Sequence, residues 1–376
     1  MPVNHKPETS RLLKKFASAA LAAALLLPGL MAGSGHAATG PTIDKSSVIV
    51  WLNRRGCYSK PGVFDDKHMC WLPNMDFRVN GPIESGTNFI VEYSLGKGPY
   101  LTFEVNGEPE PEGHWYSFDR VGSNADDEKA TQYTGPVTVT IRASNELQGM
   151  NQLLYKGTLQ VKKYLPLDPK QFPDFKDKYD YYVDQDWRMP FGYLTSIWTT
   201  SGYTSDNSNH TPPLIAKMWF RGDSSALEDS EAHLYYQGKH ISKATPGTKG
   251  WTTSETSKFN WTETTFNFMG ASDSIPVFYW ISGDEEENYP TAFQLFKNPG
   301  EYEIKVLHKG ALSRSMKFTV GPDGKVVDNG FSTQLAAMGM WMMPVKTAAQ
   351  TDGPWDAKLW QTNAFYANPV QGFQAP

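Results

Sequence analysis

Short runs of β-forming residues recur along most of this chain, and they restrict it to an all-β fold. Val48–Leu52 reads VIVWL, Phe89–Tyr93 reads FIVEY and Val137–Ile141 reads VTVTI. Each is rich in β-branched and aromatic residues, and Gly, Pro or Asn bounds it. The other runs of this kind are Tyr100–Val105, Thr158–Lys163, Ile215–Phe220, His233–Tyr236, Thr265–Phe268, Val277–Ile281, Tyr302–Leu307 and Ser315–Val320.

The runs fall into two series, which predicts two immunoglobulin-like β-sandwich domains in tandem, 44–164 and 192–330. Between them, 165–191 is rich in proline, charge and aromatic residues, so we expect an ordered connection rather than a flexible linker. The last segment, 331–376, is expected to pack on a domain or on a partner. Within it, Ser332–Met343 contains a capping residue and helix formers and predicts a short helix, followed by aromatic coil.

Residues typical of turns occur between the strand runs of both halves in a similar order. Asn106-Gly107 and Lys156-Gly157 predict turns in the first half, and Gln237-Gly238 and Lys309-Gly310 predict turns in the second. Gly96-Lys97-Gly98 has no phosphate-binding context and is interpreted as a turn. A diverged duplication with insertions would explain this likeness, and independent use of common β-hairpin chemistry explains it nearly as well.

The N-terminus carries the pattern of a bacterial export signal. A basic segment ending at Lys15 precedes the apolar run Phe16–Leu27, and Pro28 and the small residue Ala37 follow. The apolar run is shorter than the roughly 20 residues that a membrane-spanning helix needs. We therefore expect 1–37 to be a cleaved signal peptide and the protein to be secreted or periplasmic. A retained anchor is the alternative.

The charge of the chain argues against nucleic acid and anionic lipid as partners. The full chain has a formal net charge of −5, and loss of 1–37, which carries +3, leaves −8. Polyanion binding needs a positive surface. No membrane span is expected after signal cleavage.

The chain contains two cysteines, Cys57 and Cys70, and in an oxidising compartment they are expected to pair. The resulting loop of 14 residues corresponds to about 3 kcal/mol of stabilisation in the chain-entropy description. The alternative is a reactive thiol or a metal ligand assisted by His68.

Motifs of common enzymes are missing, so we expect a non-enzymatic protein. There is no HExxH, GxSxG, Walker loop or GxGxxG. The histidines are scattered, and His233 and His240, although in one hairpin, are separated because the turn pairs Tyr235 with His240. A hydrolase with a carboxylate pair drawn from distant residues is the enzymatic alternative.

Acidic runs raise the question of structural calcium, which takes oxygen ligands from loops. The main candidate is Asp284, Glu285, Glu286 and Glu287, and 177–186 and 223–231 hold two further groups. None has the EF-hand spacing, so no cofactor is expected and calcium is the weakly supported exception.

Met338, Met340, Met342 and Met343 form a pattern that suits Cu(I) ligation. They lie inside an apolar run, which favours core packing or a docking surface instead. A copper role requires a methionine face that is open to solvent.

The chain holds 12 Trp and 18 Tyr, and this abundance suggests carbohydrate binding, because flat aromatic rings stack on sugars. Trp251 and Trp261 have polar neighbours and are the predicted exposed pair, whereas Trp51, Trp219 and Trp280 are assigned to cores.

These observations together predict an exported, non-enzymatic binding or structural protein of the cell envelope or extracellular space. Its expected partner is first a protein, including another copy of itself, and second a polysaccharide. Carbohydrate binding through exposed Trp side chains and a secreted hydrolase are the alternatives.

Overall fold

The computed structural model describes residues 40–183, 188–195, 213–221, 227, 229–252, 261–269, 273–281, 286–332 and 340–347, with the side chains of 66, 195, 221, 248–252 and 261 excepted. The chain divides into the units Met1–Thr39 and Gly40–Pro376, and all described residues belong to the second. The predicted signal peptide 1–37 and the aromatic coil after residue 347 therefore lie outside the described residues. None of the described helices has the length and apolar character needed to cross a membrane.

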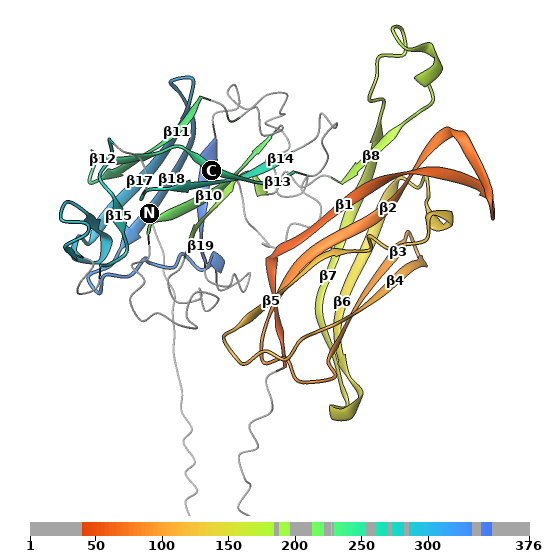
Figure 1. Cartoon of the computed structure of the whole chain (residues 1–376), viewed down its shortest axis with the longest axis horizontal. Helices are drawn as coiled ribbons and strands as arrows, with labels where there is room; N and C mark the ends of the chain where they lie inside the picture. The colour runs from red at the N-terminus through yellow and green to blue at the C-terminus, as the bar shows by residue number, and fades with distance from the viewer. Residues whose placement is uncertain are drawn as a thin grey trace, which may run out of the picture. The chain divides into compact units, whose positions relative to one another are not determined.

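The described chain is all-β, as predicted, and its first half holds two antiparallel sheets (Figure 1). One has three strands in the order β1-β2-β5, and the other has five in the order β4-β3-β6-β7-β8. Their bounds are β1 Thr42–Lys60, β2 Val63–Asn80, β3 Asn88–Leu95, β4 Gly98–Asn106, β5 Trp115–Val121, β6 Gly135–Asn145, β7 Met150–Tyr164 and β8 Asp180–Val183.

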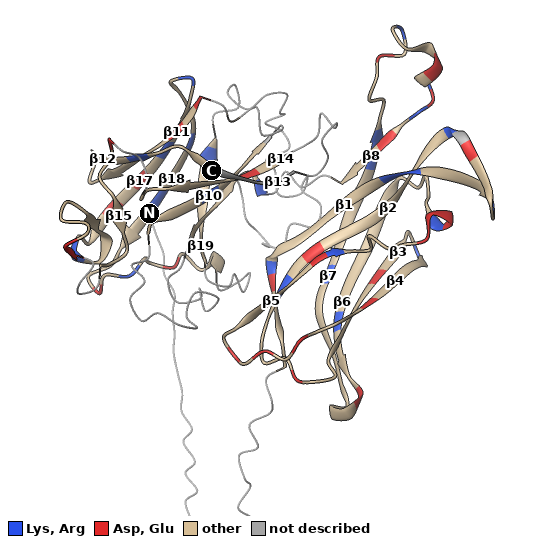
Figure 2. Cartoon of the chain, viewed as in Figure 1, with Lys and Arg blue, Asp and Glu red and all other residues tan. Residues whose placement is uncertain are grey.

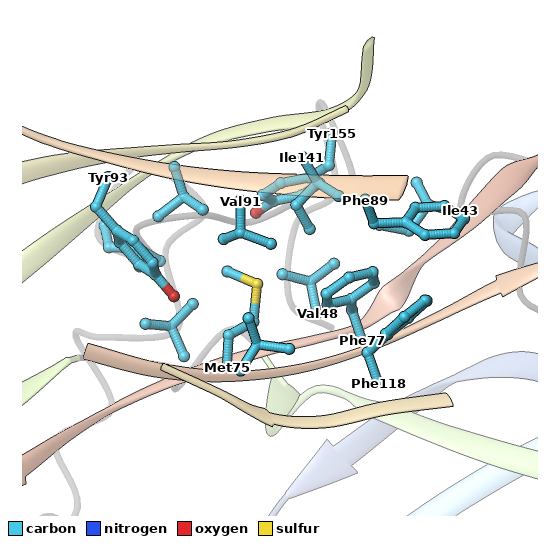
Figure 3. Close-up of a cluster of buried hydrophobic side chains, with 14 of the residues drawn as sticks. Ile43, Val48, Met75, Phe77, Phe89, Val91, Tyr93, Phe118, Ile141 and Tyr155 are labelled. Atoms are coloured by element: carbon cyan, nitrogen blue, oxygen red, sulfur yellow. The ribbon is translucent and has the colours of Figure 1, made fainter. Parts of the chain in front are cut away.

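Alternation along these strands directs one face of each sheet into a shared core (Figure 3). Phe77 of β2 stacks on Phe118 of β5 with ring centroids 4.7 Å apart, and Phe89 of β3 lies 4.8 Å from Phe118. Val91 and Ile141 of the five-stranded sheet are fully buried beside them. Burial of these apolar faces, at about 25 cal/mol per Å², is the main force that holds the two sheets together.

Two predicted turns of the first half are wrong. Asn106-Gly107 ends β4 without starting a hairpin, because the next strand, β5, pairs with β2 in the other sheet. The hairpin of β4 is with β3 and turns at Gly96, at φ 59°, which confirms the turn predicted there. Lys156-Gly157 lies inside β7, since β6 and β7 are joined by η2 (Glu146–Gln148) and Gly149.

The second half is built around a sheet of nine strands in the order β12-β11-β17-β18-β19-β9-β10-β14-β13. The end strands β12 and β13 are consecutive in the chain and separated only by Thr245, so the sheet curls until its ends meet. The bounds are β9 Phe191–Thr195, β10 Ile215–Arg221, β11 Ser230–Tyr236, β12 Lys239–Ala244, β13 Pro246–Thr252, β14 Trp261–Asn267, β17 Gly300–His308, β18 Ala311–Val320 and β19 Met340–Thr347; a short parallel pair joins β15 Val277–Phe278 to β16 Phe293–Gln294. The turns predicted at Gln237-Gly238 and Lys309-Gly310 are confirmed as the β11–β12 and β17–β18 hairpins.

The helix predicted over Ser332–Met343 is wrong in its last four residues, because Met340–Met343 belong to strand β19. Phe331 and Ser332 are helical, residues 333–339 lie outside the described residues, and the chain is extended from Met340 to Thr347. The first part of β19 pairs with β9 and its last part pairs with β18, with Pro344 near the change of partner. Pairing with β9 and with β18, together with burial of Met342 and Val345, makes Met340–Thr347 a strand.

Several strands escaped prediction because their sequences lack alternation. Much of β2 is polar or carries Pro73, yet it pairs with β1 over almost its full length. The strand β8 lies within the predicted connection 165–191 and adds to β7 as an edge strand. Conversely, the run Val277–Ile281 is a strand only at Val277–Phe278.

Candidate functional site

A bulge in β1 places an unusual set of polar groups at the edge of the first core. Asp44 is opposite Arg78 and Ile49 is opposite Asp76, so residues 45–48 of β1 face only Phe77 of β2. The carboxylate of Asp44 accepts hydrogen bonds from the backbone N–H and the hydroxyl of Ser46, at 3.0 and 2.5 Å. Side-chain bonding to nearby backbone stabilises such a departure from the ladder.

Asp44 is also one partner of a buried ion pair. Its Oδ2 lies 2.8 Å from the Nη2 of Arg78, and the carboxylate is fully buried while Arg78 is 20% exposed. The guanidinium of Arg78 lies 4.6 Å above the ring of Trp115. Burial raises the pKa of Asp44, and Arg78 and Ser46 act in the opposite direction.

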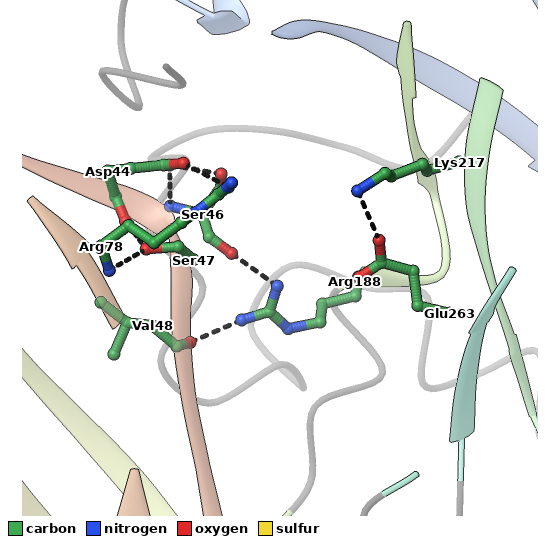
Figure 4. A network of polar contacts seen from close by, with 8 residues as sticks. All are labelled: Asp44, Ser46, Ser47, Val48, Arg78, Arg188, Lys217 and Glu263. Atoms are coloured by element: carbon green, nitrogen blue, oxygen red, sulfur yellow. Dashed lines mark hydrogen bonds and ion pairs between the residues drawn. The ribbon is translucent and has the colours of Figure 1, made fainter. Parts of the chain in front are cut away.

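Arg188 binds the carbonyl groups that the bulge turns away from the β ladder (Figure 4). Its Nη1 donates to the carbonyl of Ser46 at 2.6 Å and its Nη2 to that of Val48 at 2.5 Å. The guanidinium also lies 5.0 Å from the ring centroid of Trp219, on β10. Arg188 thus couples the β1 bulge to the nine-stranded sheet through a buried cation, whose pKa is lowered by burial.

A polar cavity of about 160 Å³ adjoins this arginine. Charged groups of both signs line it, including Arg78 and Arg188 as cations and Asp76 and Asp119 as carboxylates. Lys217 and Glu263, which form an ion pair at 3.5 Å, also line it. Elsewhere, acidic and basic residues are interspersed over the described strands rather than gathered by sign (Figure 2). The remaining lining residues are Ser46, Ser47, Ile49, Phe77, Ser117, Tyr193, Trp219 and Met340.

Among the carboxyl groups that line this cavity, that of Asp76 has the most strongly shifted pKa. It accepts a hydrogen bond from the backbone N–H of Arg120 at 2.6 Å, at a second bulge where Arg120 has φ 56°. Burial, with a smaller contribution from the like charge of Asp119, raises the pKa of Asp76 to about 6, against the effect of that hydrogen bond.

We expect the raised pKa of Asp76 to make folding stability depend on pH. Because the folded protein binds this proton more tightly than the unfolded chain does, the stabilisation is present near pH 4 and is lost as the pH rises through about 6. Asp76→Asn should remove this dependence and raise the free energy of unfolding at pH 7 by about 1 kcal/mol, allowing for solvent screening of a partly exposed group. Urea unfolding at pH 4.5, 6 and 7.5 measures both effects. An unchanged pH slope in Asp76→Asn would contradict the assignment.

A second pocket, of about 350 Å³, is largely aromatic. Trp280 and Trp341 line it and are both half-buried, and Tyr279 and Phe296 complete its aromatic wall. The Tyr279 and Trp341 rings are 5.7 Å apart. Ile281 and Val326 add apolar surface, while Asp323, Gly324 and Lys325 supply its polar part.

The predicted disulfide is confirmed, and with it the thiol alternative is excluded. Cys57 of β1 and Cys70 of β2 are bonded and buried. The His68 ring interacts instead with the carboxylate of Asp65, at 2.8 Å.

The other predicted site residues are only partly described. The side chains of Trp251 and Trp261 lie outside the described residues, although their backbones belong to β13 and β14. Asp284 and Glu285 lie outside as well. Glu286 is exposed and binds Lys297 at 2.9 Å, and Glu287 is exposed. No group of three or more His, Cys, Asp or Glu placed to hold a metal ion occurs among the described residues.

The burial of side chains tests two predictions, the one about the methionines and the one about the core tryptophans. Met340, Met342 and Met343 are at most 9% exposed, so the solvent-facing methionine surface that a copper role requires is missing from these three. Met338 lies outside the described residues. Trp219 is a core residue as predicted, but Trp51 and Trp280 are only half-buried.

Sequence reasoning missed both cavities because long-range pairing assembles them. Asp44, Asp76 and Arg188 lie far apart in the sequence, and Arg188 falls inside the predicted connection. The one local signal was Asp44 two residues before Ser46, which is typical of a turn in which a side chain bonds its own backbone.

The chain matches no family model, and no curated protein shows significant similarity to it.

Proposed function

We propose that this chain is an exported, non-enzymatic binding protein, with an immunoglobulin-like β-sandwich in its first half, that holds a saccharide in the aromatic pocket around Trp280 and Trp341. Export is supported by the basic and apolar pattern of 1–37 and by the Cys57–Cys70 disulfide, which belongs to an oxidising compartment. The two sheets over a shared core support the sandwich assignment for the first half.

The aromatic pocket is the main observation that supports a saccharide as the ligand. Its two half-buried tryptophans offer flat apolar faces, and sugar rings present matching faces of C–H groups. Asp323 and Lys325 at the same pocket are suited to hydrogen bonding with sugar hydroxyls. At about 350 Å³ the pocket falls within the size range of small-molecule sites. This concave form favours a saccharide over the protein partner that the sequence alone placed first.

Substitution of the pocket tryptophans tests this function. We expect Trp280→Ala to weaken binding of the saccharide found on a glycan array by roughly tenfold, as loss of one stacking contact implies. Trp280→Phe should restore part of the affinity, because it keeps an aromatic face. Isothermal titration calorimetry measures both.

The matched control is Trp51→Ala, since Trp51 is also half-buried but lies in β1, outside this pocket. Equal loss of affinity in Trp51→Ala and Trp280→Ala would contradict the pocket. If no glycan on the array binds and a stoichiometric protein partner is recovered from the cell envelope, the function is protein binding instead.

A hydrolase is the second candidate, and Asp76 is the observation that favours it. A carboxyl group with pKa near 6 beside Asp119 in a polar cavity has the character of a general acid. Release of reducing ends from polysaccharides, abolished by Asp76→Asn and by Asp119→Asn, would support this activity. Absence of turnover on every glycan that the protein binds would exclude it.

A further inference from the structure

His233 and His240 come together on the outer face of the β11–β12 hairpin, which the sequence spacing did not predict. Leu234 pairs with Ser242 and Tyr235 pairs with His240, so Ile241 is an extra residue in β12. His233 shares a face with Tyr235 and lies diagonal to His240, and the ring centroids of His233 and His240 are 5.0 Å apart, with an angle of 39° between the ring planes. His233 is 19% exposed and His240 is exposed, so solvent reaches the pair.

This spacing suits two imidazoles on one metal ion. With Zn–N bonds of about 2.0–2.1 Å, each ring centre lies roughly 3 Å from the ion, and a tetrahedral angle then separates the two centres by roughly 5 Å. We propose that His233 and His240 chelate a divalent transition-metal cation of the class that imidazole prefers, such as Zn²⁺.

Groups around the two rings fit a ligating role. The Nε2 of His233 lies 3.2 Å from a carboxylate oxygen of Glu231. When that nitrogen carries the proton, it donates to Glu231 and leaves Nδ1 as the basic atom. A carboxylate bonded in this way orients a ligating histidine and increases its basicity. The backbone of Ser242 interacts similarly with the ring of His240.

The charges that face the pair are compatible with a bound cation. Lys305 of β17 is opposite His233, but it forms an ion pair with Glu303 at 3.4 Å and lies over the ring of Tyr235. Lys243 of β12, the partner of His233 on the other side, binds Asp273 at 2.7 Å. Burial and the neighbouring His233 lower the pKa of His240. No group of three or more His, Cys, Asp or Glu that could hold a metal ion occurs in the described part of the chain, so the two imidazoles would be completed by water on the ion.

Zinc titration tests the site on the full chain purified without a polyhistidine tag. We expect calorimetry to show binding of Zn²⁺ that weakens at least tenfold in His233→Gln and in His240→Gln, and on the order of tenfold in Glu231→Gln. The matched control is His114→Gln, because His114 also lies beside a carboxylate, that of Glu110 at 3.8 Å, but in the first half of the chain. His114→Gln should bind zinc as the parent chain does.

Nuclear magnetic resonance supplies a second readout that a merely structural role would not affect. Zinc should shift the imidazole signals of His233 and His240 together, before those of other histidines. Binding unchanged in His240→Gln, or the absence of any zinc-dependent shift in the two rings, would overturn the proposal. Circular dichroism of each variant distinguishes loss of ligand from loss of fold.

Discussion

Asp44→Ala is expected to lower the free energy of unfolding by about 3–5 kcal/mol. The substitution removes a fully buried carboxylate and leaves Arg78, which is 20% exposed, without its ion-pair partner. It also removes the acceptor for the backbone N–H and hydroxyl of Ser46, on which the β1 bulge depends. Urea unfolding followed by tryptophan fluorescence measures the loss.

Two further variants distinguish the effect of the buried ion pair from the effect of removing any carboxylate. Asp44→Asn should lose less stability than Asp44→Ala, because the amide oxygen still accepts from Ser46. Asp65→Ala removes another carboxylate of the same half, one whose partner is the largely exposed His68, and should leave stability unchanged within error. If Asp44→Ala unfolds at the same urea concentration as the parent chain, the ion pair does not hold the bulge.

Arg188→Met is expected to cost about 2–4 kcal/mol. Methionine fills much of the same space, but the carbonyls of Ser46 and Val48 lose donors at 2.6 and 2.5 Å and remain buried. The cation–π interaction of Arg188 with the Trp219 ring is lost as well. Thermal unfolding should show a lower midpoint, and proteolysis should become faster at the β1 bulge.

The surface arginine Arg55, which pairs with Asp127 at 2.8 Å, is the control for Arg188. Arg55→Met should change stability by less than about 1 kcal/mol. Because Asp44 and Arg188 both bind Ser46, the double variant should lose less than the sum of the two single losses, by roughly 0.5–3 kcal/mol. Strict additivity would show that the two side chains stabilise the bulge independently.

The predicted end of the helix Ser332–Met343 shows the limit of local propensity in this chain, because Met340–Met343 are extended. Met340–Thr347 forms a strand because β9 and β18 both pair with it and because its Met and Val side chains enter the core. Those partners are not visible in the local sequence. Likewise, β2 carries too little alternation to be recognised and is fixed as a strand by β1.

The sequence by itself determined the all-β class, most strand positions, the Cys57–Cys70 pair and three of the hairpin turns. These features depend on alternation, β-branched composition and left-handed turn residues, all of which act over a few neighbours. Only the tertiary structure decided where polar side chains meet. Bulges at Asp44, Arg120 and Ile241 shift the strand register, and the sequence carries a local signal only for the first, in the spacing of Asp44 and Ser46. The bulge in β1 leaves the carbonyl of Ser46 to Arg188, and the bulge at Arg120 brings its backbone N–H to Asp76, because a change in register alters which groups face one another.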